Sequence, residues 1–195
     1  MSVMLDIIGA SVIIGIVILT VMNVNINLSD ENYKGMVDLH TQTETIQLAR
    51  IIEFDFYKIG YNVPPANRPA ITIADSTHIK FKTNLGDIAG ALDIIEYGLG
   101  DYVLGSTNPR DRMLFRIENL TKVYINYSVI NFKLTYYDST DTKIPTPITG
   151  SNLNKIKSIN VKLILESPEP FDTTRTGGQQ YAHAMYQKLI YPRNL

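Results

Sequence analysis

The dominant pattern in this chain is a long run of apolar residues close to its N-terminal end. From Ile7 to Ser29 there are 23 residues without a charge, and Ile, Val, Leu and Met dominate the first part of the run. At about 1.5 Å per residue, a helix of this length crosses a bilayer core of about 30 Å. We therefore predict an apolar helical segment, residues 3–28, that lies in a membrane or packs against copies of itself.

The helical pattern continues beyond the apolar run as an amphipathic stripe. Four apolar residues recur at intervals of four, four and three, which places them on one helix face that needs a sheet to cover it. Gly60 is typical of a helix C-cap, and Pro64 and Pro65 prevent continuation. We predict one helix from about Val3 to about Ile59, with Asn23–Gly35 as the segment where it could loosen. The stripe consists of Leu48, Ile52, Phe56 and Ile59.

After Pro69 the period changes to the alternation that is typical of strands. One helix followed by strands is an α+β plan. We therefore predict a long N-terminal helix, residues 1–60, packed on an antiparallel, β-rich globular domain, residues 61–195. The stretch from Gly98 to Asp111, rich in Gly, Asn and Pro, is predicted to be a loop. The predicted strands are residues 70–74, 78–82, 93–98, 113–117, 128–137, 156–165 and about 181–191.

Charge and composition argue against several functions. The 18 Lys and Arg residues balance 19 Asp and Glu residues, so no basic field attracts nucleic acid and we expect no nucleic-acid partner. The chain has no cysteine, which excludes disulfides and zinc–thiolate sites. Its three histidines lack partners at metal-binding spacing, and no nucleophile elbow or phosphate-binding glycine loop occurs. We therefore expect no metal, no cofactor and no enzymatic activity.

Three residues of the apolar segment are candidates for assembly. Asp6 stands at the edge of the run, where the helix N-terminus favours a carboxylate and headgroup water is within reach. Gly9 and Gly15 are small residues that would let apolar helices approach closely, although glycine is also common in membrane helices generally. The bulky positions predicted to face lipid or copies of the same helix are Ile7, Ile8, Val12, Ile13, Ile14, Ile16, Val17 and Leu19.

Three parts of the chain together resemble a known family. Residues 5–15 combine an acid with a glycine nine positions later at the start of an apolar helix. Residues 49–61 end a helix with an acid, a basic residue and a Gly-aromatic pair, and residues 134–138, 156–165 and 192–195 follow in the family's order. In these features the chain resembles the bacterial type IV pilin-like proteins, with the minor pilins and pseudopilins of the W and J types as the best match.

The resemblance implies a structural subunit of a helical filament. Such subunits sit in the inner membrane before assembly and later in an extracellular filament or a periplasmic pseudopilus. Their partners are copies of themselves, other pilins, and the pilus or secretion assembly machinery. In the family the acid pairs with the amino terminus of a neighbouring subunit, a role that the resemblance assigns to Asp6.

The chain departs from the family pattern at its beginning. Asp6 replaces the usual Glu, Ser2 stands where the family usually has Phe, and Met1 alone precedes it in place of a basic leader. Either the sequence starts late or the subunit is processed differently. A second interpretation of the whole chain is a single-pass, membrane-anchored extracellular β-domain that binds a ligand or a protein partner.

Overall fold

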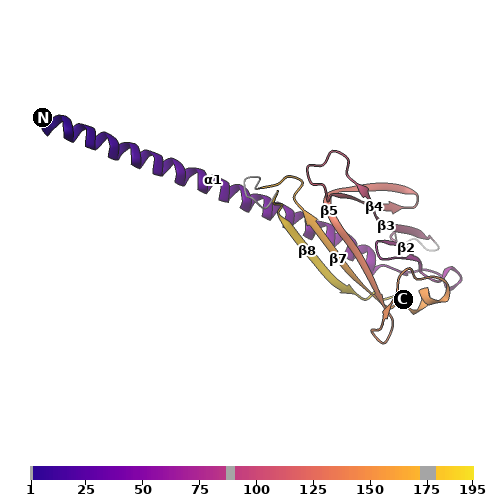
Figure 1. The fold of residues 1–195 in the computed structure, drawn as a ribbon. Coiled ribbons are helices and arrows are strands. Elements are labelled where there is room, and N and C mark those ends of the chain that lie inside the picture. Colours follow the sequence, from indigo (N-terminus) through magenta and orange to yellow (C-terminus); the bar gives the residue numbers. More distant parts are fainter. Residues whose placement is uncertain (1, 87–90, 172–178) are drawn as a thin grey trace.

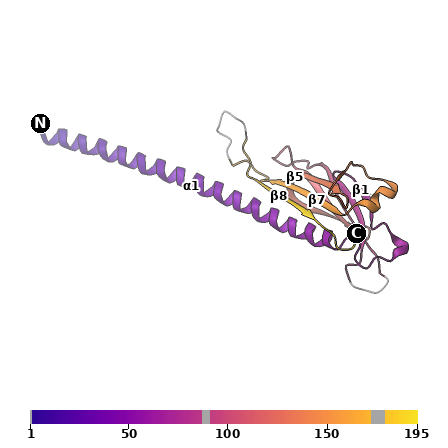
Figure 2. The same ribbon diagram turned by 90° about the horizontal axis from the view of Figure 1, so that it is seen from below.

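A computed structural model describes residues 2–86, 91–171 and 179–195, which form one long helix and one antiparallel sheet (Figure 1). Helix α1 (Ser2–Tyr57) has 56 residues and is therefore about 84 Å long. Its N-terminal part extends away from the sheet in both views, and its C-terminal part lies against the sheet (Figures 1 and 2). The predicted fold class, α+β with a long N-terminal helix on an antiparallel sheet, is confirmed.

The sheet has eight strands in the order β1-β2-β3-β4-β5-β7-β8, and β6 pairs separately with β5. All of these pairings are antiparallel. Two short 3-10 helices, η1 (Pro65–Asn67) and η2 (Gly150–Lys155), lie in the connections. The strands are β1 (Ile71–Ala74), β2 (His78–Thr83), β3 (Asp93–Tyr102), β4 (Arg112–Glu118), β5 (Thr121–Tyr137), β6 (Lys143–Ile144), β7 (Ser158–Glu166) and β8 (His183–Ile190).

Strand β5 joins two parts of the sheet. Its first part pairs with β4 and its second part with β7. Between Leu114↔Ile125 and Arg112↔Val129 the register shifts, so that four positions along β5 oppose two along β4. Extra residues on one strand interrupt the ladder and bend that strand. The bend of β5 separates it from the loop that leads into β4, and a cavity lies at this place.

The core lies between the C-terminal part of α1 and the sheet. The four residues of the amphipathic stripe, Leu48, Ile52, Phe56 and Ile59, are completely buried. The Phe56 ring packs in T-shaped contacts against the rings of Phe81 and Tyr97, with a centroid distance of 5.8 Å in each pair. Complete burial of a side chain of this size contributes about 1.5–3 kcal/mol. The stripe therefore fixes this half of the helix to the sheet.

The helix differs from its prediction in two details. It runs without interruption through Asn23–Gly35, because asparagines and one glycine lower helix propensity without breaking the hydrogen-bond ladder as proline does. It ends at Tyr57, two residues before the predicted end. Gly60 has a φ of +76°, the left-handed conformation that glycine adopts at a helix end.

The strands also differ from their predictions. Strand β3 continues to Tyr102, into the predicted loop. Gly98 serves close packing within this strand, because a Cβ there would overlap the Phe115 ring. Strand β5 begins at Thr121 rather than residue 128. A two-residue turn, Asn119–Leu120, joins it to β4 with φ of +46° and +77°. Leucine is an unusual residue for this turn, which explains why the hairpin was missed.

Candidate functional site

The N-terminal part of α1 carries uncovered apolar side chains on every side. The eight bulky positions predicted to face lipid or copies of the same helix are between 54 and 64% exposed. No residue of the most apolar stretch of this helix is buried inside the structure. The helix is therefore long and apolar enough to cross a membrane. An apolar surface of this extent marks a place where the protein meets lipid or another protein surface.

The hydroxyl groups of this segment are paired within the helix. The Ser11 hydroxyl donates to the Ile8 carbonyl at 2.9 Å, and the Thr20 hydroxyl donates to the Ile16 carbonyl at 2.8 Å. Thr41, Thr43 and Thr45 form the same bonds in the other half of the helix. The bonds therefore satisfy both hydroxyl donors of the apolar segment without distinguishing it from the rest of α1.

The three candidate assembly residues lie on different parts of this helix surface. Asp6 is exposed, and a Cβ added to Gly9 or Gly15 would meet no atom within 4 Å. At about 100° per residue, Gly9 lies about 60° from Asp6 around the axis and Gly15 on the opposite side. The described part of the chain brings neither glycine into contact with the sheet, so both leave shallow, open depressions in the helix surface.

The opposite end of α1 is tied to the sheet by a buried ionic cluster. The Asp55 carboxylate accepts hydrogen bonds from the Tyr97 hydroxyl at 2.6 Å and from Arg116 Nε at 2.7 Å. Arg116 also contacts Glu118 at 2.5 Å. Burial and the Asp55 charge raise the pKa of Tyr97 well above its ordinary value. The cluster thus holds the helix against β3 and β4.

A second tie joins the helix to the edge strand β8. Lys188 Nζ lies 2.7 Å from the Glu53 carboxylate, which also accepts a hydrogen bond from the Tyr186 hydroxyl. Burial raises the pKa of Glu53, but the bonds from Lys188 and Tyr186 outweigh it and leave the pKa below its ordinary value. The helix is therefore held on two sides.

Sequence reasoning missed Asp55 as an element of the site. The residue follows Ile52 by three positions and precedes Ile59 by four, so it shares the helix face of the apolar stripe. An acid at such spacing indicates a buried carboxylate with a cationic partner. Nothing in the sequence indicates that the partner is Arg116, because 61 positions separate the two residues.

Neither a protein-family model, nor a curated protein, nor a solved structure matches this chain. Within the described ranges, no group of three or more metal-ligating side chains could hold a metal ion. The chain's own geometry is therefore the basis for a functional assignment, and its most unusual feature is the uncovered apolar helix.

Proposed function

We propose that this chain is a structural subunit of a bacterial type IV pilin-like filament. One observation carries the proposal: an uncovered apolar helix segment continues without a break into a helix half that is fixed to a sheet domain. A flexible linker would let an anchored domain move freely. A continuous helix instead sets the distance and direction between the apolar segment and the sheet, which a regular polymer requires.

The apolar segment serves in two environments in turn. Before assembly it spans the inner membrane, where lipid covers its side chains. In the filament, the same side chains pack against the helices of neighbouring copies, and the sheet domain faces outward. Because lipid and neighbouring helices are similarly apolar, close packing rather than the hydrophobic effect drives the transfer. Gly9 and Gly15 supply places where neighbouring helices approach closely.

Asp6 gives this assembly its specificity. A carboxylate costs about 2.5–3.5 kcal/mol at the centre of a membrane helix and less near the end. Pairing with the amino terminus of a neighbouring subunit offsets that cost at one relative position of the two helices. Since Gly15 lies on the other side of the helix from Asp6, the two residues contact different neighbours.

The test is filament incorporation in cells of the natural host. An epitope-tagged chain replaces the chromosomal copy, and immunogold electron microscopy follows it in filaments on the cell surface and in isolated cell envelopes. We expect Asp6→Ala to remain in the membrane fraction and to be lost from filaments, and Asp6→Glu to restore incorporation. Asp30→Ala is the matched control, because Asp30 is an exposed acid of the same helix beyond the apolar run.

Two results would contradict this proposal. Unchanged incorporation of Asp6→Ala removes the pairing role of the acid. Absence of the unmodified chain from every filament, with the chain uniformly in the membrane, contradicts a filament subunit and favours a single-pass anchored β-domain with an extracellular partner.

A further inference from the structure

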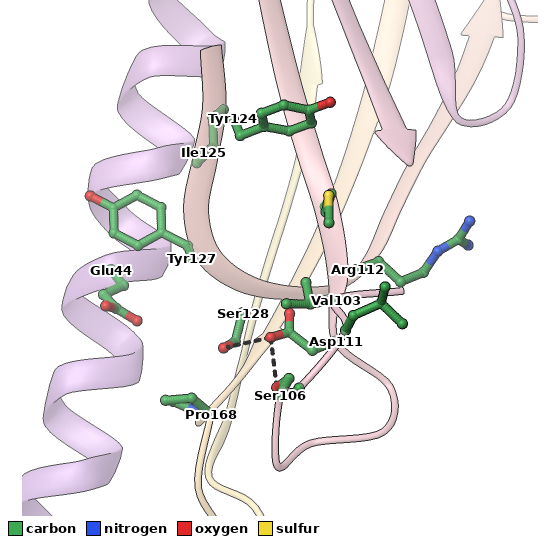
Figure 3. Close-up of a pocket in the computed structure, with 13 residues that line it drawn as sticks. Glu44, Val103, Ser106, Asp111, Arg112, Tyr124, Ile125, Tyr127, Ser128 and Pro168 are labelled. Carbon is green, nitrogen blue, oxygen red and sulfur yellow. Dashed lines mark hydrogen bonds between the residues drawn. The ribbon is translucent and has the colours of Figure 1, made fainter. Parts of the chain in front are cut away.

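A cavity of about 650 Å³ lies where β5 bends away from β4, on the side that faces α1 (Figure 3). The Asp111 carboxylate beside it accepts hydrogen bonds from the Ser106 and Ser128 hydroxyls at 3.0 and 3.3 Å. Glu44 Oε1, from the helix, lies 3.2 Å from His40 Nε2. Both acids that line this cavity therefore have partners within the chain, and the cavity gives no indication of a charged ligand.

A second cavity, of about 490 Å³, lies at the C-terminal end of α1. The helix and the turn after it contribute Tyr57, Lys58 and Tyr61, and the segment after β8 contributes Arg193 and Asn194. The size of this cavity is typical of a small-molecule site. It lies at the opposite end of α1 from the apolar segment, so an inference about it is independent of the filament function proposed above.

Gly60 lets the segment after β8 come close to the end of the helix. A Cβ added to Gly60 would lie only 2.8 Å from the Asn194 carbonyl oxygen, so a residue with a side chain would push this segment away. On the two sides of Arg193, Pro192 is buried and Leu195 packs against the core. The backbone that carries Arg193 is therefore fixed beside the cavity.

The residues that line this cavity include two cations and no acid. Arg193 is exposed and forms no hydrogen bond within the described part of the chain. Lys58 Nζ donates to the Leu85 carbonyl at 3.3 Å and lies 4.9 Å from the centroid of the Phe54 ring and 5.7 Å from that of the Tyr61 ring. These contacts hold the ammonium in place without neutralising its charge.

The acids of the neighbouring helix turn neutralise other cations. Glu53 lies 2.7 Å from Lys188, and Asp55 lies 2.7 Å from Arg116. Among the described residues, neither Lys58 nor Arg193 forms an ion pair with an acidic side chain or with the terminal carboxylate. A cavity lined by one sign of charge raises the local concentration of the opposite sign, so this cavity favours an anion.

We propose that this cavity binds an acidic sugar, with its carboxylate held by Arg193 and Lys58 and its ring against Tyr57 and Tyr61. A guanidinium matches the two oxygens of a carboxylate, and an ammonium adds a point charge. The C–H groups of a sugar ring pack on the electron-rich faces of aromatic rings, and the Asn194 amide offers a donor and an acceptor to a sugar hydroxyl. A bare phosphate would use the cations alone and leave the tyrosine walls uncovered.

The test uses the full chain in uncharged detergent micelles and follows amide shifts by NMR during titration with D-glucuronate. We expect saturable shifts at the amides of Lys58, Tyr61 and Asn194. D-glucose has the same ring without the carboxylate and should bind at least about tenfold more weakly, because hydrogen bonds between charged groups are lost. Acetate has the carboxylate without the ring and should also bind at least about tenfold more weakly, because the tyrosine contacts are lost.

Two variants on different elements test the cations. Arg193→Gln and Lys58→Gln should each weaken D-glucuronate binding at least about tenfold. Arg50→Gln is the matched control: it removes an exposed cation of the same helix that does not line the cavity, and we expect unchanged affinity. If one cavity variant fails to fold, the other variant and the ligand series on the unmodified chain still decide the question.

Four results would overturn the proposal. Absence of saturable shifts with D-glucuronate excludes the site, and unchanged affinity in a folded cavity variant excludes the role of its cation. Equal affinity for D-glucose shows that the carboxylate is not recognised. Equal affinity for acetate, or tighter binding of inorganic phosphate that is lost in Arg193→Gln, assigns a simple anion site instead of a sugar site.

Discussion

The two halves of α1 share one backbone and have opposite surroundings. Residues such as Ile13 in the N-terminal half are more than half exposed, whereas Phe56 in the C-terminal half is completely buried. The first half is apolar on all sides and needs a non-aqueous environment from outside the chain. The second half confines its apolar residues to one stripe and obtains that environment from its own sheet. Substitutions in the apolar segment should therefore change its contacts with lipid or other proteins without changing the folding of the sheet domain.

The largest contrast is expected from truncating one apolar side chain in each half. Phe56→Ala should destabilise the full chain in detergent by about 3–5 kcal/mol, because it opens a cavity in the packed core. Ile13→Ala should leave the free energy of unfolding nearly unchanged, since detergent surrounds Ile13 in both states. Urea unfolding followed by circular dichroism measures both. An equal loss of unfolding free energy in the two variants would show that both halves of the helix contribute to the packed core.

The acids of the two halves give the next contrast. Asp55→Asn should cost about 3 kcal/mol, because Arg116 loses the buried charge that pairs with it. Asp6→Asn should change the free energy of unfolding by less than about 0.5 kcal/mol, as surface substitutions usually do. The same urea experiment compares them. A stability loss in Asp6→Asn would indicate that Asp6 contributes to folding of the isolated chain.

Glycine to alanine exchanges sharpen the comparison further. Gly60→Ala should cost about 1–3 kcal/mol because of the left-handed φ, and its Cβ would lie only 2.8 Å from the Asn194 carbonyl oxygen. The Cβ of Gly15→Ala meets no atom within 4 Å, and the exchange should stabilise the helix of the isolated chain by about 0.5–1 kcal/mol. Helix content and unfolding midpoints report both effects. A destabilised Gly15→Ala monomer would contradict the open surface around that residue.

The smallest effect is a pH dependence confined to the packed half. Because the pKa of Glu53 is lower in the folded state, its contribution to stability is present above the ordinary carboxyl value of 4.5 and is lost as the pH falls through the folded-state pKa. Glu53→Gln should therefore flatten the fall in unfolding midpoint between neutral and acid pH. Glu31→Gln, on the exposed half of the helix, serves as the control. If the unfolding midpoint falls equally with decreasing pH in the unmodified chain and in Glu53→Gln, Glu53 makes no such contribution.

Local patterns in the sequence predicted much of the fold. The period of apolar residues identified the helix and its stripe, and alternation identified seven of the strands. The long apolar run also indicated the part of the helix that the sheet leaves uncovered. These features depend on neighbours within a few positions, which is why a single sequence reveals them.

The features that sequence reasoning missed depend on distant residues. The two-residue strand β6 is too short to show a period, and the turn at Leu120 lacks the usual turn residue. The Asp55–Arg116 pair and the Asp111 cavity arise only when the sheet places remote segments together. The bend of β5 follows from a register shift, and no local pattern in the sequence of β5 predicts that shift.

The contacts of α1 with the sheet also determine how a pulling force would pass through the chain. Residues 47–59 contact β3, β4, β5 and β8 through Tyr97, Arg116, Tyr127 and Lys188, and through the buried stripe. Figures 1 and 2 show β8 lying alongside this half of the helix. Tension along the helix axis therefore acts as shear on all of these contacts together instead of separating them one after another. A chain held in this way should resist extension by the collective strength of its contacts, with rupture governed by its unfolding rate under load.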